Sequence, residues 1–127
     1  MQFGRWVFAI AGIYGLIVLT PQYFMECQIG RDYPPAITHP EFFYGFNGVA
    51  LAWQVAFLVI SRDPARFRPL MLPAVLEKAS FGIAGWILFA QQRIPALIVG
   101  FASLDLVLGA LFIAAYFLTA PNRARSD

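Results

Sequence analysis

The sequence predicts an all-α, polytopic membrane protein in which four transmembrane helices form an up-down-up-down bundle. Of the 127 residues, 60% are hydrophobic and only 13% are charged, whereas an average soluble domain is about 25% charged. Four apolar runs are also long enough to cross a bilayer, which takes roughly 20 residues of helix. They cover about 5–24, 41–61, 68–91 and 95–119, so we expect a single membrane domain over 1–127.

The first run, 5–24, is predicted to be a retained helix rather than a removable signal peptide. No small-x-small cleavage site follows its apolar core, because the chain continues LTPQYFMECQIG. Pro21 lies close to the end of this run. The connection that follows contains Pro34 and Pro35, which exclude a helix at that point.

Capping and proline signals set the limits of the other three runs. Thr38, with Glu41 three residues later, is a capping-box pattern that opens the second helix. Asp63 before Pro64 predicts a helix cap after the second connection. Pro95 starts the fourth helix, and residues 120–127 are predicted to be a loose tail. The segments GIYG, GFNG and GIAG place small residues where helices can pack closely.

The arginines predict the orientation of the bundle. With the N-terminus inside, the cytoplasmic side carries Arg5, Arg62, Arg66, Arg68, Arg123 and Arg125, and the other side carries Arg31 and Arg93. Short cytoplasmic loops carry the excess of positive residues, so both termini are predicted to be cytoplasmic. The net charge of +2 is small and the arginines are scattered, which argues against a nucleic-acid partner.

A set of polar side chains lies within the apolar runs, although a charge in hydrocarbon costs about 2.5–3.5 kcal/mol. The set consists of Tyr14, Asn47, Gln54, Glu77, Lys78 and Asp105. At about 1.5 Å per helical residue, Glu77 lies roughly 13 Å and Asp105 roughly 21 Å from the cytoplasmic side. We expect Lys78 to pair with Asp105 or Glu77, and Asn47 and Gln54 to complete the hydrogen bonds.

Several interpretations of this polar set stay open. The side chains could hold the helices together by hydrogen bonds, line an internal pocket for a lipophilic ligand, or transfer protons or ions. A further alternative is that Glu77 and Lys78 extend toward the cytoplasmic headgroups. A proton relay would favour more carboxylates or a histidine within the membrane, and the single histidine, His39, lies in the outer connection.

The outer connection, residues 25–40, and the start of the second helix form a candidate docking surface for a protein partner or for a second copy of the chain. Long connections are often functional. The predicted docking residues are Tyr33, His39, Glu41, Phe42 and Tyr44, of which the aromatic ones also suit an interfacial belt. The spacing of His39 and Glu41 is not that of a structural metal site, and Cys27 has no assured activating neighbour. We therefore predict no metal site and no catalytic residue.

Three segments resemble the DoxX-like family of small bacterial membrane proteins. They are RWVFAIAGIYGLIVLTP, RDPARFRPLML leading into LEKASFG, and SLDLVLGALFIAAYF. The resemblance covers most of the chain and implies a four-helix bundle of the bacterial inner membrane. Some relatives of DoxX are described as a subunit of a thiosulfate:quinone oxidoreductase, which implies quinone as a candidate ligand.

The leading prediction for function is a non-catalytic accessory or scaffold subunit of a larger membrane complex. The first alternative is a protein that binds a lipophilic molecule, such as a quinone or a lipid, within a redox system. The second alternative is a minimal transporter. All three predictions depend on the polar interior and on the long outer connection.

Overall fold

The computed structural model describes residues 2–120, and this part of the chain contains helices and no strand. The long helices are α1 (Gln2–Leu19), α3 (Pro40–Arg62), α4 (Met71–Ala90) and α5 (Ala96–Leu118). A short helix α2 (Glu26–Asp32) and the 3₁₀ turns η1 (Thr20–Phe24) and η2 (Arg68–Leu70) lie between them. Four segments are long and apolar enough to cross a membrane, namely Gln2–Phe24, Pro40–Arg62, Arg68–Ala90 and Ala96–Leu118. This is the architecture of a small multi-pass membrane protein.

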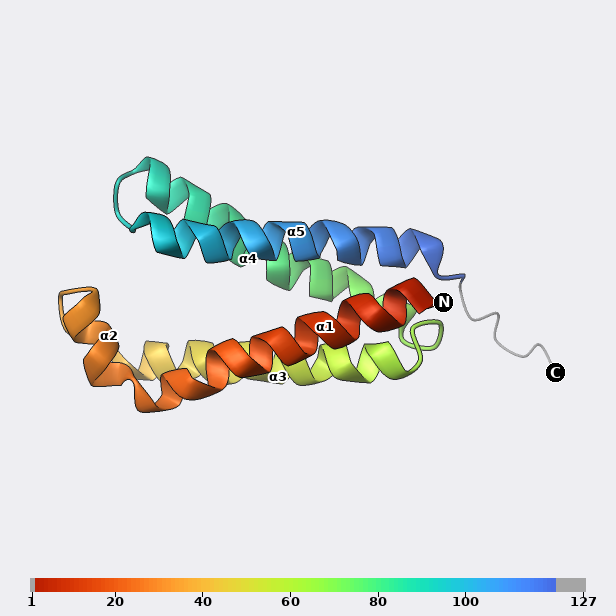
Figure 1. The fold of residues 1–127 in the computed structure, drawn as a ribbon, viewed down its shortest axis with the longest axis horizontal. Coiled ribbons are helices and arrows are strands. Elements are labelled where there is room, and N and C mark those ends of the chain that lie inside the picture. Colours follow the sequence, from red (N-terminus) through yellow and green to blue (C-terminus); the bar gives the residue numbers. More distant parts are fainter. Residues whose placement is uncertain (1, 121–127) are drawn as a thin grey trace.

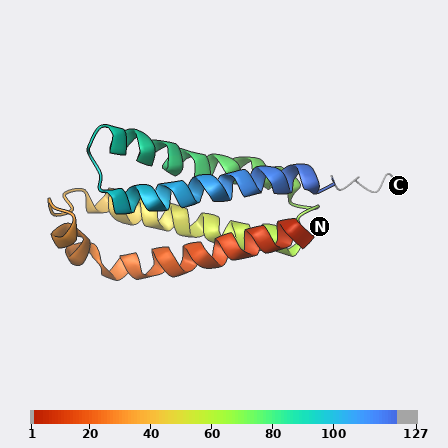
Figure 2. The ribbon, with the colours of Figure 1, turned by 45° about the horizontal axis from the view of Figure 1, so that its top comes forward.

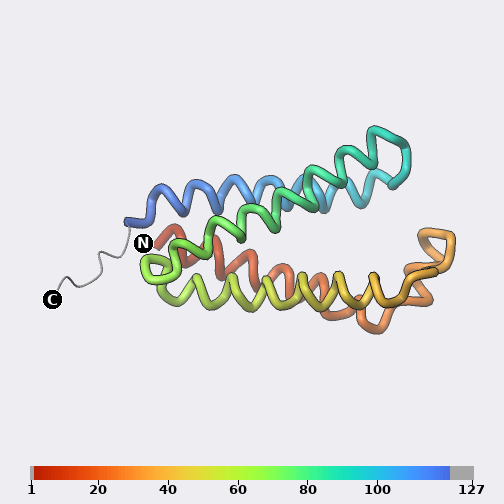
Figure 3. Tube along the Cα trace, turned by 180° about the vertical axis from the view of Figure 1, so that it is seen from behind, coloured from red at the N-terminus to blue at the C-terminus, as the bar shows by residue number. Residues whose placement is uncertain are grey.

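The long helices form two antiparallel hairpins, α1–α3 and α4–α5 (Figure 1). α1 packs mainly against α3, and α4 mainly against α5, whereas α3 and α4 barely touch. Contacts between α1 and α5 join the hairpins, and Figure 2 shows α1 and α4 on opposite sides of the bundle. The hairpins converge at the end where α1 begins, here called the terminal end, and diverge toward the opposite, distal end (Figure 3).

The hydrophobic core occupies the terminal half of the bundle. Three fully buried rings from three helices meet there, because Phe8 stacks on Phe112 with ring centroids 4.2 Å apart and Phe57 lies edge-on to Phe112 at 5.0 Å. The other buried members of this cluster are Val7, Ala11, Ile60, Met71, Ala74, Leu108 and Ala115. These aromatic contacts therefore join α1, α3 and α5 at the terminal end.

Glycines allow close packing within each hairpin. A side chain at Gly15 would overlap the Gln54 amide of α3, and a Cβ added to Gly85 would lie 2.5 Å from the Ala102 Cβ of α5. In the GFNG segment of α3, a Cβ added to Gly45 would have nothing within 4 Å, whereas one added to Gly48 would lie 3.3 Å from the Tyr23 hydroxyl. The prediction of helix packing is thus confirmed for the glycines of α1 and α4 but not for Gly45.

Two capping predictions are wrong. Thr38 does not cap α3, because Pro40 is the first helical residue and places the cap at His39, without a side-chain hydrogen bond. Asp63 ends α3 rather than opening α4. Its Oδ1 accepts a hydrogen bond of 3.2 Å from the Arg66 backbone nitrogen, so it caps the turn between these helices.

The outer connection contains the helix α2, which the sequence analysis did not predict. This helix ends at Asp32, just before Tyr33 and the two prolines, in agreement with the bias of residues before proline against helix. Apart from Ala120, the predicted loose tail 120–127 lies outside the described residues. The same is true of Arg123 and Arg125, which contribute to the predicted orientation.

Candidate functional site

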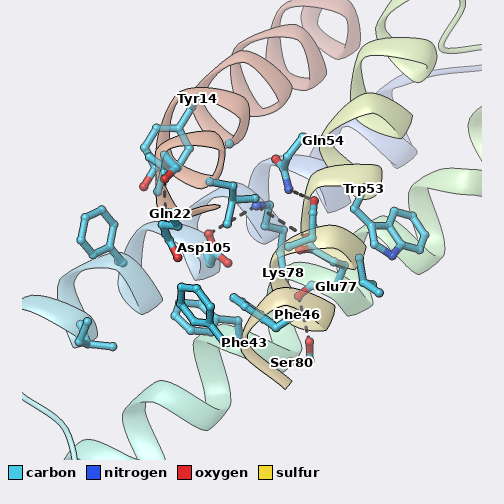
Figure 4. Close-up of a pocket in the computed structure, with 18 of the residues that line it drawn as sticks. Tyr14, Gln22, Phe43, Phe46, Trp53, Gln54, Glu77, Lys78, Ser80 and Asp105 are labelled. Atoms are coloured by element: carbon cyan, nitrogen blue, oxygen red, sulfur yellow. Dashed lines mark hydrogen bonds and ion pairs between the residues drawn. The ribbon is translucent and has the colours of Figure 1, made fainter. Parts of the chain in front are cut away.

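A cavity of about 790 Å³ lies between the two hairpins where they diverge (Figure 4). Its walls include Phe43, Phe46 and Trp53 from α3, Phe81 from α4 and Phe101 from α5. Pockets for small molecules typically measure about 300–1,000 Å³ and are mostly apolar, with a few polar groups that fix orientation. The size and the lining of this cavity are therefore within the range typical of small-molecule pockets.

A charged cluster, Glu77, Lys78 and Asp105, lies where the cavity meets the core (Figure 4). The Lys78 Nζ is 3.4 Å from the Asp105 Oδ1, to which it donates a hydrogen bond, and 3.7 Å from the Glu77 Oε2. The same nitrogen lies 5.2 Å from the centroid of the Phe57 ring. The three charged side chains therefore turn toward each other inside the bundle and not toward the headgroups.

Small residues of α5 make room for this cluster. Gly109 follows Asp105 by one helical turn, and a Cβ at Gly109 would lie 3.4 Å from the Lys78 Cβ. Ala102, one turn before Asp105, is fully buried. Residues three and four apart share a helix face, so the stripe of Ala102, Asp105 and Gly109 presents its one carboxylate to α4.

Gln54 and Asn47 are buried but do not complete the hydrogen bonds of the charged cluster, so this prediction is wrong. The Gln54 Nε2 donates to the Ala50 carbonyl oxygen at 2.8 Å, which leaves its Oε1 without a partner among the described residues. Neither side-chain polar atom of Asn47 has a partner there, and this residue does not line the cavity. Tyr14 lines the cavity from α1.

The five predicted docking residues differ in their surroundings, and their role in docking stays a prediction. Tyr33 lines the cavity, whereas Phe42 is exposed and the exposed His39 Nδ1 lies 3.5 Å from the Glu41 Oε1. The Tyr44 hydroxyl donates a hydrogen bond of 2.8 Å to the Glu26 Oε2 and so ties the start of α3 to α2.

Sequence reasoning missed the aromatic wall of the cavity. Phe43, Phe46, Ala50 and Trp53 all line it from α3. Their spacings of three, four and three residues place them on one helix face. This periodicity is visible in the sequence beside the polar positions of the same helix, but Phe43 also suits an interfacial belt, and only the tertiary arrangement separates these roles.

Within residues 2–120, no group of three or more His, Cys, Asp or Glu side chains is placed to hold a metal ion. Comparisons of the chain with protein-family models, with curated proteins and with solved structures found no match. The resemblance to the DoxX-like family therefore stays a prediction, and a function has to be argued from the cavity itself.

Proposed function

We propose that the protein binds a lipophilic molecule with a polar head in the cavity between its two hairpins. The observation that carries this proposal is the charged cluster at the inner limit of an otherwise largely apolar cavity. The apolar body of the ligand lies against the aromatic wall, and its head reaches Glu77, Lys78 and Asp105. A quinone and a lipid are the two ligand classes that the sequence analysis favours.

A polar group inside a membrane protein is expensive unless it is paired, and such groups commonly mark a ligand or ion pathway. Interhelical hydrogen bonds in membranes stabilise by about 0.6 kcal/mol on average. This is less than the free-energy cost of placing three charged groups in the membrane. Helix adhesion alone also leaves the adjoining cavity without a role. A ligand that uses both the charges and the apolar volume accounts for the two features together.

The ligand enters from the side, between α3 and α4. The backbones of these helices barely approach each other, and the main aromatic contact between them is the tilted pair of Phe46 and Phe81, with ring centroids 6.4 Å apart. Val49 and Leu76, which line the cavity from the same two helices, are largely exposed. In a membrane this side of the bundle meets acyl chains, so a lipophile reaches the cavity without crossing water.

An accessory or scaffold role and a transport role stay predictions. The accessory role depends on the outer connection, where His39, Glu41 and Phe42 are exposed. Transport requires a route past the packed rings of Phe8, Phe57 and Phe112 at the terminal end. Binding in the cavity requires neither a partner protein nor such a route, and it is compatible with both roles.

The test is retention of a lipophile through purification in mild detergent, measured by native mass spectrometry and solvent extraction. The Val49→Trp variant places a bulky side chain at the side entrance of the cavity without removing a polar group, and it should lose most of the bound lipophile. Val59→Trp is the matched control, since Val59 lies on the same helix, is exposed and does not line the cavity. Equal retention by the two variants, or the absence of any lipophile from the wild-type protein, would reject the proposal.

A further inference from the structure

All three residues of the charged cluster line the cavity, and the two carboxylate side chains are more exposed than the lysine. The Lys78 side chain is only 4% exposed, whereas those of Asp105 and Glu77 are 14% and 19% exposed. Each carboxylate directs one oxygen to Lys78, namely the Asp105 Oδ1 and the Glu77 Oε2. Within the described residues, the Asp105 Oδ2 and the Glu77 Oε1 accept no hydrogen bond, and neither belongs to the fully buried polar atoms without a partner. The accessible polar atoms of the cluster are therefore mainly carboxylate oxygens, which are acceptors.

The net charge of the cluster also favours a positive group in the cavity. Two carboxylates share one ammonium, so the fully ionised cluster carries one net negative charge in an apolar surrounding. An uncompensated charge is costly there, and a positive group close by lowers this cost. Lys78 has already directed its nitrogen at both carboxylates, and it has little surface left for a ligand that brings only acceptors, such as the carbonyl oxygens of a quinone.

The walls of the cavity suit a cation as well. Tyr14, Phe43, Phe46, Trp53 and Phe101 all line it. The faces of aromatic rings attract cations, most strongly where water is excluded. An ammonium head that enters this cavity meets carboxylates at its inner limit and aromatic side chains along the walls.

We infer that the ligand of this cavity is a lipophilic cation, an apolar chain or ring system that carries a protonated amine. This inference rests on the proposed function and specifies the chemical class of its ligand. The ammonium donates hydrogen bonds to the Asp105 Oδ2 and the Glu77 Oε1 and balances the net charge of the cluster. A neutral acceptor head or an anionic head of the same size gains neither interaction.

The experiment uses three probes that share one chain, namely bromodecylamine, bromodecanol and bromodecanoate, with the full-length protein in nanodiscs. Bromine quenches tryptophan fluorescence on contact. One protein keeps only Trp53, which lines the cavity, and the matched control keeps only Trp86, which does not line it. The Trp86 protein reports partition of each probe into the bilayer, so the ratio of the two responses measures occupation of the cavity.

The protonated amine should quench Trp53 at a concentration about tenfold lower than the alcohol or the carboxylate does, after correction by Trp86, which corresponds to about 1.4 kcal/mol. Asp105→Asn and Glu77→Gln, introduced separately into the Trp53 protein, should each reduce this advantage, and either one suffices where the other does not fold. Equal corrected quenching by all three probes overturns the inference but leaves the proposed function standing. If no probe quenches Trp53 more than Trp86, both are rejected.

Discussion

One ammonium, that of Lys78, is shared by two carboxylates. This ratio determines how strongly each substitution in the charged cluster changes the stability of the protein. Without Asp105, the lysine still has Glu77 at 3.7 Å. Without Lys78, the two carboxylates face each other and the cavity with no cation nearby. A buried ion pair that loses one partner costs more than a pair that is replaced as a whole by apolar groups. The stability of the protein should therefore depend more on the lysine than on either carboxylate.

We predict that Lys78→Met lowers the free energy of unfolding by about 3–5 kcal/mol, because it leaves buried carboxylates uncompensated. Asp105→Asn should lower the free energy of unfolding by less, since the lysine keeps one partner. The double variant Lys78→Met/Asp105→Asn should be more stable than Lys78→Met alone. Thermal and denaturant unfolding in detergent measure these differences. Glu41→Gln is the control, as it removes an exposed pair worth about 0–1 kcal/mol. Equal losses for Lys78→Met and Asp105→Asn would contradict the shared arrangement.

The pairing of Lys78 could be anticipated from the sequence, because charges in apolar helices rarely persist alone. The absence of hydrogen bonds from Asn47 and Gln54 to the charged cluster, among the described residues, could not be anticipated. Both lie on the buried face of α3, as their spacing indicates, but Gln54 satisfies its amide nitrogen within its own helix. Helix periodicity identifies the buried face, whereas the partner of each polar atom depends on rotamers and on the exact height of the neighbouring helix.

At the scale of the helices, length and hydropathy were sufficient to predict four spans, because a bilayer requires each span to satisfy its own backbone and to face lipid. They were insufficient to predict which helices pair. α5 is apolar on nearly all sides, so its hydropathy marks no single contact face. The small residues are the better guide, since they allow the close approach of α1 to α3 and of α4 to α5.

The glycines of the α4–α5 hairpin differ in how closely the partner helix approaches them, and the sequence alone does not show this difference. Gly85→Ala should destabilise the α4–α5 hairpin by about 1–3 kcal/mol, because the new methyl group would lie 2.5 Å from the Ala102 Cβ. Gly100→Ala is the matched control on α5, where nothing lies within 4 Å. That change should be neutral, or stabilising by up to about 1 kcal/mol through helix propensity. Unfolding of both variants in the same detergent is the measurement, and a loss of stability in Gly100→Ala as large as that in Gly85→Ala would refute the contact.

At the scale of the whole molecule, the two ends of the bundle differ in how closely the hairpins pack. The terminal end holds the packed aromatic rings, and the Arg68 Nε there donates a hydrogen bond of 3.0 Å to the Tyr116 carbonyl oxygen. The distal end carries the separated hairpins and α2 (Figure 1). The predicted orientation places the terminal end in the cytoplasm, so the wider part of the gap between the hairpins belongs to the outer half of the membrane. The orientation therefore decides from which leaflet the proposed ligand would enter.

Cys27 allows a direct test of this orientation, because it is the single cysteine of the chain and is exposed in α2 at the distal end. A maleimide that cannot cross membranes should label Cys27 in intact spheroplasts, since the distal end is predicted to face outward. In the matched control, Cys27→Ser combined with Ala65→Cys moves the thiol to the connection at the terminal end. That protein should be labelled only after the membrane is made permeable. The opposite pattern would place the distal end in the cytoplasm, and the cavity would then draw its ligand from the inner leaflet.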